Sequence, residues 1–291
     1  MFFCKGDGGT KNLPAPPAMG RHPRNSPQKR AAFSKACWVG AYTACAGRFS
    51  NRGMRAMQGK TMKRFHKQAG IVAVDGGFAV QLDGRGVKTP VGRKLEVPSE
   101  RLALAIAGEW DAQGEVIKPY TMPLTQLATT ALDRVGPERA VITDQMIAYA
   151  ATDLLCYRAE SPSDLVAVQT KTWQPLLDWC RTQLDAGLIV TTGVIAIDQP
   201  AASLAALRAR LDGYDLWRLT AAQAACSASG SLVLALALTE GRLTGAECFT
   251  ASNLDEAYQV AQWGDDYEAA DRRAELQRDI QAAADLLALL P

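Results

Sequence analysis

The sequence predicts an α+β protein in which a small β-rich domain with one helix precedes an all-α helical bundle. Residues 71–97 alternate between short apolar runs and Asp-Gly turns, as strands joined by hairpins do. From residue 121 onward, apolar side chains recur at helical spacing in almost every segment. We therefore expect a basic N-terminal extension at 1–62, a β-rich domain at 63–120 and a helical domain at 121–291.

The extension differs from the rest of the chain in charge. The chain from residue 1 through Lys67, which includes the extension, has fourteen Lys and Arg against one acid, whereas the remaining residues include eighteen basic and twenty-nine acidic ones. The extension also lacks the apolar periodicity of a core. Two interpretations remain open. The extension is either a transit peptide to the mitochondrial matrix, or an over-extended gene start of a bacterial cytoplasmic protein that begins at Met62. We favour the second, because Met62-Lys-Arg-Phe65 directly precedes the orderly sequence.

The expected β-rich domain is a series of short strands followed by one helix. Ile71–Val74 and Phe78–Leu82 are predicted strands, each followed by an Asp-Gly turn, and 87–90 and 94–97 continue the series. Pro98 then opens a helix with Ser99 as its N-cap. Apolar residues mark the buried face of that helix, namely Leu102, Ile106 and Trp110, and Gly114 ends it.

The expected helical domain contains roughly six to eight helices. Pro162 and Pro175 are each predicted to begin a separate helical piece, because proline is tolerated only in the first turn of a helix. Thr244 and Glu247 have capping-box spacing, which predicts a helix running to about Gly264. The last predicted helix has its apolar residues on one stripe, namely Leu276, Ile280, Ala283, Leu287 and Leu290.

Several chemistries are disfavoured by the residues that the chain lacks. It has only two histidines, His22 and His66, which argues against a Ser-His or Cys-His nucleophilic centre and an HExxH metal site. A P-loop is excluded because five residues, not four, separate Gly53 from Gly59. The apolar run Leu232–Leu238 is too short for a membrane span. We therefore expect no cofactor, metal, small-molecule substrate or membrane insertion.

Acidic residues remain as the candidates for function. Asp255 and Glu256 belong to one predicted helix, and Asp265, Asp266 and Glu268 begin the next. The dipole of a helix favours acids in its first turn, and this structural explanation carries most weight. A binding surface is the second explanation, because Trp263 adjoins these acids as an aromatic anchor would. Asp153 is expected to be a helix cap or a buried hydrogen-bond partner rather than a general base.

Seven short motifs occur in an order that resembles a known family. They are Leu82-Asp-Gly-Arg85 with Lys88-Thr-Pro90, Glu109-Trp-Asp-Ala-Gln113, Met122-Pro-Leu-Thr125, Thr152-Asp-Leu-Leu-Cys-Tyr-Arg158, Trp173-Gln-Pro-Leu-Leu-Asp-Trp179, Gly230-Ser-Leu-Val-Leu-Ala-Leu-Ala237, and Asp255-Glu256 with Trp263-Gly264. Together they are similar to the F(1)-ATPase assembly chaperones that act on the alpha subunit of ATP synthase. The resemblance runs from about Arg64 to Leu290 and excludes the basic extension.

The resemblance implies a non-catalytic chaperone that binds the free alpha subunit, masks its subunit interface and promotes assembly of the catalytic hexamer without nucleotide or metal. It also implies a functional acid in the C-terminal helical region. The candidate partner-binding residues are therefore Glu256, Trp263, Asp265, Asp266 and Glu268.

Three alternatives to this function remain. The first is a hydrolase or transferase, which would gather Asp153, Glu256 or Glu268 in a deep pocket. The second is a general holdase that protects unrelated clients as well as alpha. Nucleic-acid binding is the least favoured, because the body of the chain is acidic.

Overall fold

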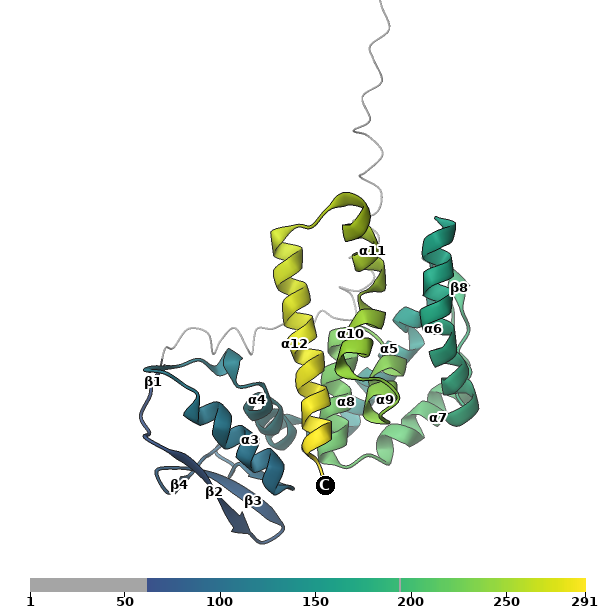
Figure 1. Ribbon diagram of the computed structural model, residues 1–291. Coiled ribbons are helices and arrows are strands. Elements are labelled where there is room, and N and C mark those ends of the chain that lie inside the picture. The colour runs from purple at the N-terminus through teal and green to yellow at the C-terminus, as the bar shows by residue number, and fades with distance from the viewer. Residues whose placement is uncertain (1–61, 194) are drawn as a thin grey trace, which may run out of the picture. The chain divides into compact units, whose positions relative to one another are not determined.

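The computed structural model describes residues 62–193 and 195–291. Short strands precede a series of helices along this part of the chain (Figure 1), which confirms the predicted α+β class. The proposed extension lies almost wholly outside the described residues. In the described part of the chain, the strands and helices run from β1 (Met62–Lys63) to α12 (Tyr267–Leu289).

The N-terminal sheet is built on an antiparallel hairpin. β2 (Ala69–Val74) pairs with β3 (Gly77–Leu82) over its whole length, and β3 also pairs with β4 (Arg85–Gly86) and β5 (Glu96–Val97). The predicted turns are present, since Gly76 has φ +85° and Gly84 has φ +77°. A side chain would be strained at these angles, which explains the glycines.

One helix, α3 (Glu100–Asp111), packs on this sheet (Figure 1). Its buried residues include the predicted stripe of Leu102, Ile106 and Trp110. Ser99 is its N-cap and accepts a hydrogen bond from the backbone N–H of Leu102 at 3.1 Å. The helix ends at Asp111, just before the predicted stop at Gly114.

The Glu109–Gln113 motif joins the sheet, α3 and the first helix of the helical region. The Glu109 carboxylate accepts hydrogen bonds from the backbone N–H groups of Leu124 and Thr125, both at 2.8 Å, and from the Thr125 hydroxyl at 2.7 Å. These groups lie in the first turn of α4 (Pro123–Thr130). Asp111 accepts from the N–H of Ala69 at 2.7 Å. The motif therefore serves to hold the structure together.

The helical region is organised around α9 (Leu232–Thr239), whose eight residues are all buried. Helices α5, α6, α8, α10 and α12 all contact it. The other elements of the region, in chain order, are η2 (Pro119–Thr121), the π-helix η3 (Ala131–Val135), α5 (Arg139–Ala151), η4 (Leu154–Cys156), α6 (Ser163–Gln183), α7 (Ala201–Asp212), α8 (Leu216–Ser229), α10 (Gly245–Ser252) and α11 (Leu254–Trp263). Short strands also pair: β1 with β6 (Val116–Ile117), and β7 (Tyr157–Arg158) with β8 (Thr191–Thr192).

Two predicted helix boundaries are wrong. Pro175 lies inside α6 and does not begin a new helix. The proline costs one backbone hydrogen bond, but Trp173, Leu176 and Leu177 on the buried side hold the helix together across it. The helix predicted from Thr244 to Gly264 is two helices, α10 and α11, which separate at Asn253. The described part of this region contains nine α-helices, α4 to α12, against the predicted six to eight.

Asp153 is a buried cap, as predicted. Its side chain is inaccessible to solvent and accepts hydrogen bonds from Leu155 N–H at 3.1 Å, Val233 N–H at 3.1 Å and the Ser231 hydroxyl at 2.7 Å. Ser231 in turn caps α9 through the N–H of Leu234. Burial raises the pKa of Asp153 to about 6, although these hydrogen bonds oppose the rise.

Candidate protein-binding site

The five predicted site residues lie on a helical hairpin formed by α11 and the first half of α12. We call residues 254–279 the arm. In Figure 1 its two helices lie side by side and project from the rest of the bundle. Within α11 only Leu254 is buried, and the buried residues of α12 all lie from Ile280 onward. The arm is therefore attached to the core at its base and is accessible along most of its length.

The tip of the arm exposes two large aromatic side chains. Trp263, the last residue of α11, is 78% exposed, and Tyr267, the first residue of α12, is 79% exposed. Gly264 separates the helices with φ +84°, an angle that other residues rarely adopt. Water-exposed Trp and Tyr this close together are typical of protein-binding surfaces, where such side chains contribute much of the affinity.

The acidic residues of the arm fall into two groups. The Arg273 guanidinium contacts Glu256 at 3.0 Å and Asp265 at 2.5 Å, so it links α11 to the loop and to α12. Arg273 also holds the pKa of Asp265 below its ordinary value. In contrast, the carboxylates of Asp266 and Glu268 have no hydrogen bond or ion pair from any side chain of the described residues, and both are exposed.

The structure thus separates the predicted site residues by environment. Glu256 and Asp265 are engaged within the arm, whereas Trp263, Asp266 and Glu268 are available to a partner. Sequence reasoning missed Tyr267, whose exposure no local pattern predicts. The sequence feature that could have identified Tyr267 is its position, because it follows Trp263 by four residues across a glycine.

The base of the arm is fixed to α6. The Gln169 side-chain amide donates to the Asp255 carboxylate at 2.7 Å, and the Tyr258 hydroxyl donates to Asp164 at 2.8 Å. Just before the arm, the Trp173 indole N–H donates to the carbonyl of Ala251 at 2.8 Å. These three contacts give the arm a defined attachment, although little of its own surface is buried.

The acids required by a hydrolase or transferase line neither of two concavities on the described part of the chain. Two surface concavities, of about 580 and 370 Å³, have linings that include none of Asp153, Glu256 and Glu268. Asp153 is also fully buried and engaged in hydrogen bonds. Among the described residues, no cluster of three or more His, Cys, Asp or Glu has the arrangement to hold a metal ion. No helix in that part of the chain has the length and apolar character to cross a membrane.

Comparisons with known proteins agree on one family. Residues 63–181 match the family model described as ATP12 chaperone protein. The chain is similar to the solved structure of Atp12 from Paracoccus denitrificans, with 39% identity, 79% of this chain and 98% of that chain covered, and a TM-score of 0.74. A protein from Agrobacterium tumefaciens shares 38% identity, with 86% of this chain and 96% of that chain covered and a TM-score of 0.76. The mitochondrial protein atp12 of Schizosaccharomyces pombe is 27% identical over 236 residues, which cover 77% of this chain and 81% of that protein.

Proposed function

The chain belongs to the ATP12 chaperone family, and on this premise we propose that it binds the free alpha subunit of ATP synthase F(1) and promotes assembly of the catalytic hexamer. The observation that supports a binding role is the tip of the arm, where Trp263 and Tyr267 are exposed beside the carboxylates of Asp266 and Glu268, which pair with no side chain of the described residues. In this proposal the protein acts by binding alone, without nucleotide, metal or a catalytic residue.

The physical basis is the masking of an apolar surface. A subunit that awaits its neighbours exposes an interface that would otherwise lead to aggregation. The aromatic pair of the arm supplies apolar contact area, and the carboxylates beside it select basic or neutral client surfaces over acidic ones. The chaperone must bind alpha less tightly than the beta subunit does, so that assembly displaces it.

We also propose where the protein acts. Its relatives include a bacterial protein and a mitochondrial one. In this proposal the compartment is the bacterial cytoplasm, with the mitochondrial matrix as the alternative if residues 1–62 are a transit peptide.

The first experiment is co-purification of the full chain with separately expressed alpha and beta subunits. We expect capture of alpha and not of beta, and less light scattering from alpha on dilution from denaturant. Failure to capture alpha would contradict the proposal. Equal protection of an unrelated aggregating protein would favour a general holdase instead.

The second experiment tests the arm with the double variant Trp263→Ala, Glu268→Ala. Both side chains are exposed, so the melting temperature should stay at the wild-type value. Loss of an aromatic anchor typically costs about 2 kcal/mol or more of binding energy, so the affinity for alpha should fall roughly 30-fold. Titration calorimetry or a pull-down series would measure the change.

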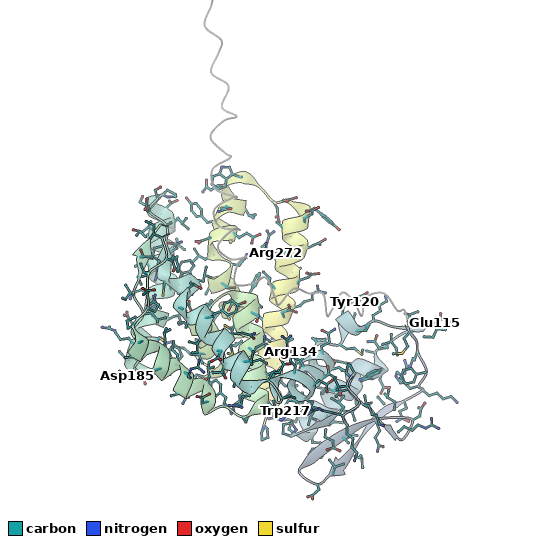
Figure 2. All side chains as sticks on the ribbon, turned by 180° about the vertical axis from the view of Figure 1, so that it is seen from behind. Glu115, Tyr120, Arg134, Asp185, Trp217 and Arg272 are labelled. Carbon is teal, nitrogen blue, oxygen red and sulfur yellow. The ribbon has the colours of Figure 1, made fainter. Side chains whose placement is uncertain are left out.

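The matched control is Tyr120→Ala, Glu115→Ala. Figure 2 shows both residues on the N-terminal part of the molecule, away from the arm that bears Arg272. They are likewise exposed, and their side chains make no hydrogen bond or ion pair to another described residue. The control should retain wild-type affinity. If both double variants bind alpha equally well, the arm is not the contact surface.

A further inference from the structure

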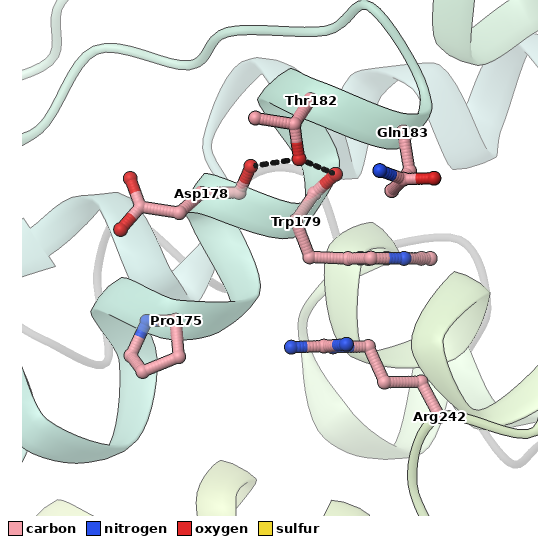
Figure 3. Close-up of a pocket in the computed structure, with 6 residues that line it drawn as sticks. All are labelled: Pro175, Asp178, Trp179, Thr182, Gln183 and Arg242. Carbon is pink, nitrogen blue, oxygen red and sulfur yellow. Dashed lines mark hydrogen bonds between the residues drawn. The ribbon is translucent and has the colours of Figure 1, made fainter.

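We propose a second protein-binding surface on the outward face of α6, where Arg242, stacked on Trp179, binds a carboxylate side chain from an acidic segment of a protein partner. This surface is separate from the arm, and the inference does not depend on the proposed function. Figure 3 shows the six residues that line it, with the indole of Trp179 facing the guanidinium of Arg242.

The surface is a concavity of about 580 Å³ between α6 and the chain that follows α9. Residues 175, 178, 179 and 182 of α6 line it, and their spacing of three and four places them on one helical face. Trp173, Leu176, Leu177 and Cys180 form the opposite, buried face of the same helix. The Trp173–Trp179 motif therefore has one tryptophan in the core and the other at this outer concavity.

Arg242 is the free cation among the described residues that line this site. Its guanidinium carbon lies 5.7 Å from the centre of the Trp179 ring, and stacking of this kind occupies the faces of both groups. The N–H donors lie in the guanidinium plane and remain available at its edge. No carboxylate or carbonyl of the described chain accepts a hydrogen bond from the Arg242 side chain. A planar set of free donors matches a carboxylate, which can accept two of them together.

The second concavity provides a contrast. There Arg210 pairs with Glu240, and Arg218 contacts Asp215 at 3.5 Å, so both arginines already have acidic partners from this chain. A carboxylate from outside would have to displace one of those acids. Arg242 requires no such displacement, which is why we assign the acidic partner to its concavity.

The groups around Arg242 are arranged before a partner arrives. The backbone N–H of Arg242 donates to the carbonyl of Ala237 at the end of α9, at 2.8 Å, and Gly241 turns the chain there with φ +70°. Trp179 projects from a helix whose other face is buried in the core. Binding would therefore order few additional groups, which lowers its entropic cost.

The remaining lining residues are compatible with an acidic partner. Asp178 is the acid of the site, and it already accepts hydrogen bonds from Gln174 at 3.1 Å and Arg181 at 3.4 Å. The exposed ring of Pro175 offers an apolar wall. A proline inside a helix costs about 3 kcal/mol relative to alanine, and at this exposed position no core packing explains it.

Nuclear magnetic resonance of the ¹⁵N-labelled full chain would test the proposal through its indole N–H signals. The chain has six tryptophans, and the variant Trp179→Phe identifies the signal of Trp179. The probe is the blocked peptide acetyl-Leu-Asp-Glu-Leu-amide, and its neutral match is acetyl-Leu-Asn-Gln-Leu-amide. We expect the acidic peptide to shift the Trp179 signal with a Kd on the order of 1 mM, which is about −4 kcal/mol. The neutral peptide should shift it much less.

The variant Arg242→Gln should weaken the response at least about 10-fold, the loss of one charge-assisted contact. The control Arg272→Gln removes another exposed arginine and should leave the response unchanged. The proposal is overturned by no shift at about 10 mM peptide, by an equal shift with the neutral peptide, or by a full response in Arg242→Gln. An equally strong shift with inorganic phosphate would also overturn it, since the site would then bind anions without preference for an acidic segment.

Discussion

Asp153 and the acids of the arm are the same kind of side chain in opposite environments. Asp153 is fully buried, and its oxygens accept hydrogen bonds from residues of two elements. Asp266 and Glu268 are exposed to solvent near two exposed aromatic side chains. The buried acid holds helices together, whereas the exposed acids are free to contact another molecule. An acid's role in this chain therefore follows from the donors that surround it.

Glu109 and Asp265 lie between these extremes. The Glu109 carboxylate is half-buried and receives three hydrogen bonds from the start of α4. Asp265 is exposed but is paired with Arg273. A substitution should lower the stability more when it takes the acceptor away from more internal hydrogen-bond donors. Where the acid is exposed, the effect should be confined to the arm.

The largest effect is expected from Asp153→Ala. The change leaves the Ser231 hydroxyl and the N–H groups of Val233 and Leu155 without their buried acceptor. Buried donors without partners cost about 1–3 kcal/mol, so we expect a loss of about 3 kcal/mol and a clearly lower melting temperature. Denaturant unfolding would measure the loss. Asp271→Ala, an exposed acid of α12, should change the stability by no more than about 0.5 kcal/mol.

The pH dependence of stability isolates the ionisation of Asp153. In the folded protein its pKa is about 6, above the ordinary value of 3.8, so the folded state binds more protons between these two pH values. The contribution of Asp153 is therefore fully present below pH 3.8 and is lost as the pH rises through 6. The stability of wild type minus that of Asp153→Asn should fall by about 2 kcal/mol between pH 4 and pH 7. A flat difference would contradict the raised pKa.

A smaller effect is expected from Glu109→Ala. It removes the acceptor for the first-turn N–H groups of α4, and the loss of such a cap costs about 1–2 kcal/mol. Glu109→Gln should fall between wild type and alanine, because one of its two oxygens is replaced by a donor. Amide exchange should quicken first at Leu124 and Thr125. Glu115→Ala is the control, since the side chain of Glu115 is exposed; equal stability in all three variants would contradict the capping role.

The sequence predicted elements that depend on nearby residues. Asp-Gly turns identified the β2–β3 hairpin, and one stripe of apolar residues identified α3. The predictions were wrong at Pro175, where a helix was expected to begin, and at Asn253, where one was expected to continue. Packing on distant elements decides whether a helix continues through a proline or breaks at an asparagine. The nature of Asp153 as a cap was predicted, but not its partner Ser231, which lies 78 positions away.

The candidate site was predicted in part for the same reason. Trp263 and the acids near it are close in sequence, so the sequence alone could predict that they lie together. The sequence could not predict which of their side chains are exposed, because exposure depends on the surfaces that the rest of the chain covers. This is why Tyr267 was missed, and why the pairing of Arg273 with Glu256 and Asp265 could not be distinguished from free charges.

The smallest effect on stability, and the sharpest test of the arm, is expected from Arg273→Met. The substitution removes the contacts to Glu256 and Asp265 but keeps a long apolar stem, and ion pairs whose carboxylates are open to solvent contribute little to unfolding free energy. The melting temperature should stay close to the wild-type value. Amide exchange should quicken within residues 255–270, because α11 and the start of α12 lose their shared guanidinium. Under the proposed function, capture of alpha should weaken as the tip loses its fixed geometry.

The control is Arg272→Met, which changes the neighbouring, exposed arginine. It should neither quicken amide exchange in the arm nor weaken the capture of alpha. If the two variants exchange alike, the Arg273 contacts do not hold the arm, and its order must come from its attachment to α6.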